Sequence, residues 1–296
     1  MQAMILAAGF GTRLLPYTKY RPKPLFPVLN TPLLLAAIRR LKNSGFSRII
    51  VNCHHLGEQI VACLEGIDDV FIQREERILG TGGGLRRALD TLDDEPLLVV
   101  NGDIYHSIDV RELYHFHLRN GHGVTMAVHD CPRFNKLSLS DNRVLDFDGS
   151  TAGARQRAFT GIMVINPDLL TPIKKDTASC IIEYYRKILA QNQVIFTREY
   201  QRCSWTDMGT PEDYLRLHGD LLSGRVPIWP ELDCGTTQHC IDGRAECADD
   251  LHIQEWACIG RARIGARVKL CRCVVWDGAV IEPGRVLSDE IVLPHY

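Results

Sequence analysis

The fold is decided by Ala3-Met4-Ile5-Leu6-Ala7-Ala8, an apolar run that leads directly into Gly9-Phe10-Gly11-Thr12-Arg13. The apolar run predicts a buried strand. The two glycines predict a loop whose backbone N–H groups can come close to an anion, because glycine lacks a side chain and tolerates positive φ. Arg13 adds a planar guanidinium that can pair with two phosphate oxygens. We therefore expect a polyphosphate-binding loop at the end of a core strand.

A second cation follows ten residues later, where Lys23 stands between Pro22 and Pro24. Proline on each side limits the local backbone, so the ammonium is presented with little conformational freedom. A single Gly-x-Gly is a weak signal, and many such matches are ordinary turns. The loop is not a P-loop, because Gly-Lys-Ser/Thr is missing, and it lacks the third glycine of a dinucleotide fingerprint.

Strands and helices alternate after this loop, which indicates an α/β fold. The expected sheet is Rossmann-like, mixed but mostly parallel, and sandwiched by helices. In such sheets ligands bind beyond the carboxyl ends of the strands, where the glycine loop would lie. The expected elements include strands over 48–52, 70–73, 97–100, 123–129 and 159–165, a hairpin over 136–147, and helices over 33–41, 57–64, 110–119 and 180–191, with Thr31, Asp109 and Thr210 as N-caps.

Two further stretches suggest chemistry. Gly82, Gly83 and Gly84 stand at the start of a predicted helix, where each glycine costs about 1 kcal/mol against alanine. Something must therefore approach this backbone closely, either the edge of a nucleobase or a tightly packed neighbouring segment. Asp103 follows the strand over 97–100 through Asn101-Gly102, where a carboxylate can hold Mg²⁺.

The strings LAAGFGTRLLPYT (residues 6–18) and RPKPLFPV (residues 21–28) closely resemble the signature of sugar-phosphate nucleotidyltransferases. These enzymes make nucleotide sugars from a nucleoside triphosphate and a sugar 1-phosphate. The stretches NGDI and WTDMGTP resemble the two metal-binding elements of the family. The stretch LGTGGG resembles a third element, and its triple glycine is closest to the N-acetylmuramate-1-phosphate uridylyltransferase branch.

The resemblance implies a set of site residues. Arg13 would hold the β- and γ-phosphates, Lys23 would bridge the two reacting phosphates, and Asp103 and Asp207 would hold one Mg²⁺ ion. The catalytic residues implied are Arg13, Lys23 and Asp103. The nucleotide-binding residues implied are Leu6, Ala7, Ala8, Gly9, Gly11, Thr12, Arg13, Lys23, Gly80, Thr81 and Gly82, and the sugar-binding residues are Asn101, Thr160 and Gly161.

Specificity is less determined. The glycine-rich element favours UTP and an N-acetylated sugar acid, while a GTP-using mannose or heptose-phosphate enzyme is the alternative. Many relatives carry a Glu-Lys-Pro lysine that binds the sugar phosphate, and Asp148-Gly149-Ser150 stands here instead. A non-catalytic subunit that senses nucleotide sugars is a further alternative, although all four charged residues of the mechanism are present.

The last third of the chain has a different pattern. Small or branched apolar residues recur at every sixth position, and a period of six predicts a short left-handed β-helix of hexapeptide repeats. The positions are Ala262, Val268, Val274, Val280, Val286 and Val292. We expect a catalytic domain over 1–222, a linker over 223–233 and this tail over 234–296. A scaffold or homo-oligomerisation role is favoured over an acyltransferase, for which His239 and His252 would be the only candidate bases.

Composition limits the partners. A net charge of −2 and a pI near 6.6 argue against general binding to nucleic acid or to a membrane surface. The sequence shows no 18-residue apolar stretch and no leader, so we expect a cytoplasmic protein. Eleven irregularly spaced cysteines are expected to be reduced, and a zinc site at Cys234, His239, Cys240 and Cys247 matches no standard spacing.

Overall fold

The computed structural model describes residues 1–232, 234 and 238–294. The chain forms two compact units, one of Met1–Phe10 with Ile38–Trp205 and one of Gly11–Ala37 with Thr206–Tyr296. The division differs from the predicted boundaries at 222 and 234, because residues 11–37 and the helix before the linker pack with the tail. Part of the predicted linker and tail (233, 235–237 and 295–296) lies outside the described residues.

The first unit is built on a nine-stranded sheet in the order β5-β4-β1-β6-β11-β8-β12-β10-β9. The strands β5, β4, β1 and β6 are parallel to one another, whereas β11 runs antiparallel to both β6 and β8. The sheet is therefore mixed. Its first half is parallel as expected, and β8 and β12 are also parallel, but β11 and the hairpin add antiparallel pairs. The bounds are β1 Gln2–Leu6, β4 Arg48–Cys53, β5 Val70–Arg74, β6 Leu97–Asn101, β8 Val124–His129, β9 Leu137–Ser140, β10 Arg143–Asp146, β11 Arg155–Ile165 and β12 Phe196–Glu199.

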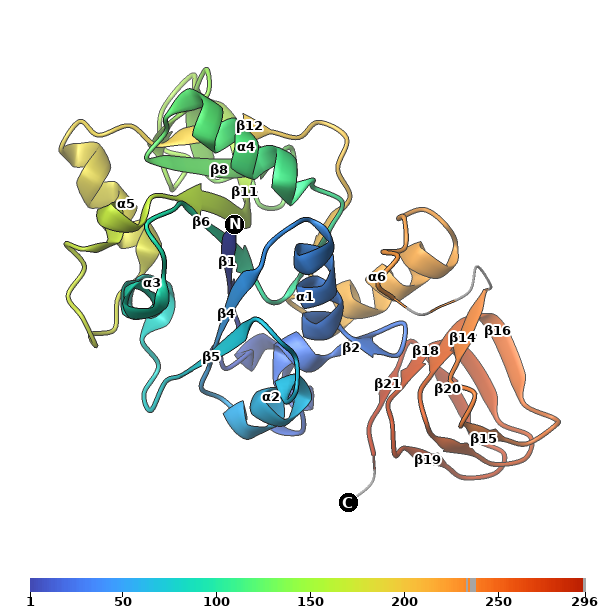
Figure 1. Cartoon of the computed structure of the whole chain (residues 1–296). Helices are drawn as coiled ribbons and strands as arrows, with labels where there is room; N and C mark the ends of the chain where they lie inside the picture. The colour runs from blue at the N-terminus through green and yellow to red at the C-terminus, as the bar shows by residue number, and fades with distance from the viewer. Residues whose placement is uncertain (233, 235–237, 295–296) are drawn as a thin grey trace. The chain divides into compact units, whose positions relative to one another are not determined.

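Helices flank this sheet (Figure 1). Helices α3 and α5 lie side by side, and α4 packs on β8 and β11. Asp109 caps α4 as predicted, since its Oδ1 accepts a hydrogen bond from Glu112 N at 2.9 Å. The bounds are α1 Leu33–Asn43, α2 Gly57–Leu64, α3 Gly80–Ala88, α4 Val110–Asn120 and α5 Ile181–Ala190. The structure describes no helix long and apolar enough to cross a membrane.

The second unit contains α6 (Pro211–Leu222) and a short hairpin of β2 (Pro27–Val28) and β3 (Thr31–Pro32). Thr210 caps α6 as predicted, because its Oγ1 accepts from Asp213 N at 3.2 Å. The predicted cap at Thr31 is wrong. Thr31 lies in β3 and pairs with Val28 across the hairpin, so its backbone is part of an antiparallel ladder.

The tail consists of short parallel strands stacked on one another. Most residues pair with the residue 17 positions later, as Glu246 does with Arg263 and Lys269 with Val286. The expected period of six breaks at Val286, which is 69% exposed, while Leu287 is buried and pairs with Leu270. A 17-residue repeat is one residue shorter than three hexads, which moves the inward positions by one. The bounds are β14 His239–Ile241, β15 Glu246–Cys247, β16 His252–Ile259, β17 Arg263–Ile264, β18 Lys269–Val275, β19 Val280–Ile281, β20 Val286–Ser288 and β21 Ile291–Val292.

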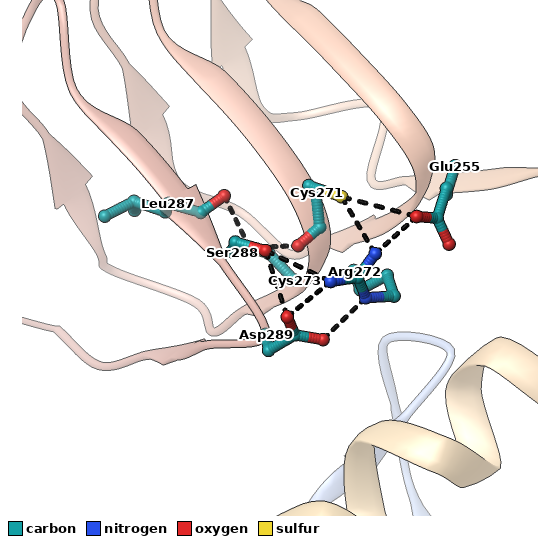
Figure 2. Close-up of polar contacts among 7 residues, drawn as sticks. All are labelled: Glu255, Cys271, Arg272, Cys273, Leu287, Ser288 and Asp289. Atoms are coloured by element: carbon teal, nitrogen blue, oxygen red, sulfur yellow. Dashed lines mark hydrogen bonds and ion pairs between the residues drawn. The ribbon is translucent and has the colours of Figure 1, made fainter.

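A ladder of charges follows the same repeat. Arg272 pairs with Glu255 and with Asp289, which lie in the neighbouring turns of the stack (Figure 2). All three residues have positive φ, between 52° and 61°. The same backbone conformation with positive φ therefore recurs in successive turns of the stack, and the side chains at these positions alternate in charge.

Candidate functional site

The loop after β1 has the form that the sequence predicts. Ala7 and Ala8 are buried, whereas Gly9 is exposed, and a Cβ added at Gly9 would meet no atom within 4 Å. Gly11 has φ +62°, and a Cβ there would lie 2.8 Å from Thr18 Cγ2. Gly9 therefore leaves open space at the end of the strand, and Gly11 is required by both backbone conformation and packing. Thr12 is exposed in the turn that follows.

A buried polar network joins this loop to the start of α3. Asn52 Oδ1 accepts from Ala7 N at 2.8 Å, and Asn52 Nδ2 donates to Glu75 Oε1 at 2.8 Å. The other carboxylate oxygen of Glu75 accepts from Leu79 N at 2.8 Å. Gly84 leaves room for this network, since a Cβ there would lie 3.1 Å from both Asn52 Nδ2 and Glu75 Oε1. Two predicted nucleotide-binding segments are thus held together by one amide and one carboxylate.

The segment before α5 packs closely against the glycines of α3. Added Cβ atoms at Gly80 and Gly83 would lie 2.7 Å from Ser179 O and 2.4 Å from Thr177 O. Gly82 N donates to Ser179 O at 2.8 Å, and Thr81 Oγ1 accepts from Ile181 N at 3.0 Å. Close packing, the alternative considered for this stretch, accounts for these glycines. Nucleotide binding by Gly80, Thr81 and Gly82 stays a prediction.

The residues predicted near the sugar lie at the ends of β6 and in β11. Leu6 pairs with both Asn52 and Asn101, so the ends of three parallel strands are level, and Asp103 follows β6 by two residues. Asn101 adjoins Gly161, whose added Cβ would lie 2.6 Å from Asn101 Nδ2.

Thr160 is differently placed. Its side chain is fully buried and its hydroxyl donates to Ala127 O at 2.8 Å. Its carbonyl oxygen accepts from Trp205 Nε1 at 2.9 Å. Thr160 therefore supports the sheet through the backbone of β8, and its part in sugar binding stays a prediction.

The second unit brings both predicted phosphate-binding cations to one carboxylate. Asp207 Oδ1 lies 3.2 Å from Lys23 Nζ, and Asp207 Oδ2 lies 3.6 Å from Arg13 Nη2. Lys23 is buried, with 7% of its side chain exposed, while Arg13 is 61% exposed. Gly209 leaves the space for the Arg13 pair, because a Cβ there would lie 2.8 Å from Arg13 Nη1. Two cations beside one acidic group form a centre that can bind a polyphosphate.

The predicted metal ligands have suitable chemistry. Asp103 and Asp207 are both partly exposed carboxylates, the ligand type that Mg²⁺ prefers. The two residues belong to different units of the structure. Among the described residues, no group of three or more His, Cys, Asp or Glu side chains could hold a metal ion, so the idea of zinc in the tail gains no support.

Sequence reasoning missed the roles of Asn52 and Glu75. Asn52 is a polar residue inside an apolar strand pattern, which is a usable signal, because a buried amide must find partners. Glu75 gives no local signal, since its role depends on residues far away in the chain. Gly209 lies within the quoted element WTDMGTP, but its closeness to Arg13 is evident only in the structure.

Comparisons with known proteins identify the family of this chain. Residues 2–224 match the family described as nucleotidyl transferase. The probable mannose-1-phosphate guanylyltransferase 1 of Oryza sativa is 28% identical over 327 residues, covering 100% of this chain and 86% of that protein. The mannose-1-phosphate guanylyltransferase of Mycobacterium tuberculosis is 27% identical over 299 residues, covering 97% of this chain and 83% of that protein.

Two solved structures support the fold. A putative glucose-1-phosphate thymidylyltransferase from Bacillus anthracis, in complex with a sucrose, has a TM-score of 0.67 and 21% identity over 79% of this chain and 99% of its own. HddC from Yersinia pseudotuberculosis, complexed with GMP-PN, has a TM-score of 0.61 and 21% identity over 73% of this chain and 97% of its own. Because the family match covers most of the chain and includes the loop, Lys23, Asp103 and Asp207, the chain belongs to the nucleotidyl transferase family and is an enzyme of nucleotidyl transfer.

Proposed function

We propose that the enzyme transfers a guanylyl group from GTP to a sugar 1-phosphate of the mannose type and releases pyrophosphate. The relatives from rice and Mycobacterium tuberculosis are named for this reaction and align with 97–100% of the chain, so their similarity extends over the tail. These relatives give no support to UTP or to the muramate branch, and they favour the GTP-using alternative. The base and the sugar rest on their names.

The reaction itself rests on one observation, the pairing of Lys23 and Arg13 with Asp207. An oxygen of the sugar phosphate forms a bond to the α-phosphorus of the triphosphate, and the bond from that phosphorus to the bridging oxygen breaks. The nucleophile needs no general base, since the second pKa of a phosphate monoester is about 6. Two unit charges about 4 Å apart repel by about 4 kcal/mol at an effective dielectric near 20, so countercharge from the two cations is the main requirement.

We assign Mg²⁺ to Asp103 and Asp207. When bound, the ion would neutralise charge on the phosphate oxygens. Asp207 pairs with both cations, and the phosphates would compete with its carboxylate for Lys23 and Arg13. The Asp207 carboxylate thus pairs with the two cations that the phosphates would bind, and it is also the proposed metal ligand.

We also infer that the tail is a short hexapeptide-type β-helix that serves as a scaffold. The parallel stacking of short strands and the buried apolar positions support this assignment. A homo-oligomer formed through the tail is a prediction that sedimentation analysis of the full chain would test.

The test is a pyrophosphate-release assay with Mg²⁺ that crosses four nucleoside triphosphates with mannose, heptose, glucose and N-acetylmuramate 1-phosphates. We expect release with GTP and mannose 1-phosphate. Lys23→Met should lower kcat/KM at least about a hundredfold, since a charge-assisted contact to a phosphate is lost in the transition state. Lys19→Met is the matched control, because Lys19 is an exposed lysine four residues away and should leave activity unchanged.

Each other outcome has a definite meaning. Release with UTP and N-acetylmuramate 1-phosphate alone would overturn the guanylyl assignment and restore the uridylyl one. Nucleotide binding by calorimetry without release from any pair would favour the sensing subunit. If Lys23→Met were as active as Lys19→Met, the proposed role of the cation would be wrong.

A further inference from the structure

The tail contributes a buried aromatic residue that packs against the segment containing Lys23. Trp276, just after β18, is 1% exposed. Its ring centroid lies 4.8 Å from that of Phe26 in a T-shaped contact and 6.3 Å from that of Tyr17. The Arg21 guanidinium lies 4.8 Å from the Trp276 ring centroid. Trp276 therefore contacts three residues between 17 and 26, on both sides of Lys23 in the chain.

The indole is also hydrogen-bonded toward the same segment. Trp276 Nε1 donates to Tyr214 Oη at 3.2 Å, and the Tyr214 hydroxyl donates to Pro27 O at 2.5 Å. Burial raises the pKa of Tyr214 well above its usual value, so the hydroxyl keeps its proton and can donate. These two hydrogen bonds connect the tail to Pro27, the first residue of β2.

A second anchor lies at the turn between β2 and β3. Asn30, with φ +66°, donates from Nδ2 to Ile259 O in the tail at 2.8 Å. Asn30 Oδ1 accepts from Cys258 Sγ at 3.1 Å. The tail therefore contacts the chain at two places, where Trp276 packs against residues 17–26 and β16 is hydrogen-bonded to Asn30.

We propose that Trp276 is a positioning residue for Lys23, and that the tail acts through Trp276 to hold residues 17–27, on either side of Lys23, in place. Lys23 Nζ must stay fixed at Asp207 although lysine has a long flexible side chain. One indole contacts side chains on both sides of Lys23 in the chain. The inference rests on the proposed function, because Lys23 has a phosphate to bind only if that function is correct.

The test uses full-length Trp276→Leu and Trp276→Phe, with Leu270→Ala as the control. Leu270 is fully buried in the apolar core of the tail itself, so its loss tests tail stability alone. We expect Trp276→Leu to lower kcat/KM for the triphosphate by about tenfold or more. Trp276→Phe keeps a ring against Phe26 and Arg21 and should recover most of this loss.

A second readout does not depend on turnover. Lys23 is 7% exposed, so an amine-reactive ester should label it slowly in the wild type. Peptide mass spectrometry should show several-fold faster labelling of Lys23 in Trp276→Leu and no change in Leu270→Ala. Equal effects of Trp276→Leu and Leu270→Ala on both readouts would overturn the inference. A wild type without transfer activity would defeat the proposed function, and the labelling rates would still decide whether Trp276 positions Lys23.

Discussion

Replacing Glu75 by glutamine should break the network that joins the β1 loop to α3. In the native chain, Ala7 N and Leu79 N are donors at the two ends, Asn52 contributes one acceptor and one donor, and Glu75 contributes two acceptors. Every contact therefore pairs a donor with an acceptor. With glutamine at position 75, every orientation of the two amides leaves at least one contact between two donors.

The magnitude follows from burial. Glu75 is 4% exposed and Asn52 is 3% exposed, so water cannot replace a lost partner. A buried donor without an acceptor costs about 1–3 kcal/mol. In Asn52→Asp alone, two carboxylates face each other, and one of them must bind a proton, which is also destabilising. The double variant Glu75→Gln/Asn52→Asp restores a donor and an acceptor at every contact.

The assay is a double-mutant cycle on the free energy of unfolding in urea, followed through the transition of the first unit, together with calorimetric affinity for the triphosphate. We expect each single variant to be less stable and the double variant to be close to the wild type, with a coupling energy of about 1–3 kcal/mol. Additive losses in the double variant would refute the hydrogen-bond assignment. Restored stability without restored affinity would show that the network does not position the nucleotide loop.

Three other predictions follow from single sites. Gly161→Ala should lower the free energy of unfolding in urea by about 2–5 kcal/mol, because φ is +75° and the new Cβ would lie 2.5 Å from Ile104 Cδ1. The control Gly153→Ala has the same φ and no atom within 4 Å of the new Cβ, so it should show only the backbone part of about 1–2 kcal/mol. Burial lowers the pKa of His218 from 6.5 to about 4, so on acidification the unfolded chain binds a proton before the folded one does. The free energy of unfolding should therefore fall by roughly 3 kcal/mol as the pH drops from 6.5 to 4. His218→Gln should remove that part of the pH dependence of the melting temperature. Arg272→Ala should lower the melting temperature slightly, and the difference should shrink in 1 M salt, since the ion pairs to Glu255 and Asp289 are solvent-exposed; an unchanged difference in salt would count against the ladder.

Locally encoded features were predicted well. The helix caps at Asp109 and Thr210 depend on a residue and the backbone three positions later, and both are present. The expected cap at Thr31 has the same residue type but is wrong, because the chain folds back at Leu29-Asn30 and places Thr31 in a ladder with Val28. A cap motif does not specify whether the preceding residues pair with another strand.

The glycines of α3 also show that a local sequence pattern does not identify distant partners. Their sequence pattern indicates a close approach to the backbone of α3, but only the structure identifies Ser179 and Thr177 as the approaching residues. These residues lie about 100 positions away, and no local period encodes such a distance. The tail repeat is a related case, since its spacing of 17 rather than 18 depends on where each turn closes.

The sequence by itself determined the strand, the glycine loop and the identity of the charged residues, because these depend on side-chain chemistry and on neighbours along the chain. Only the tertiary structure decided which of them meet. Lys23 and Asp207 are 184 positions apart, and Asn52 reaches Glu75 across 23. Such contacts arise from the packing of whole elements, in which the burial of apolar surface sets the positions and the polar groups find partners afterwards.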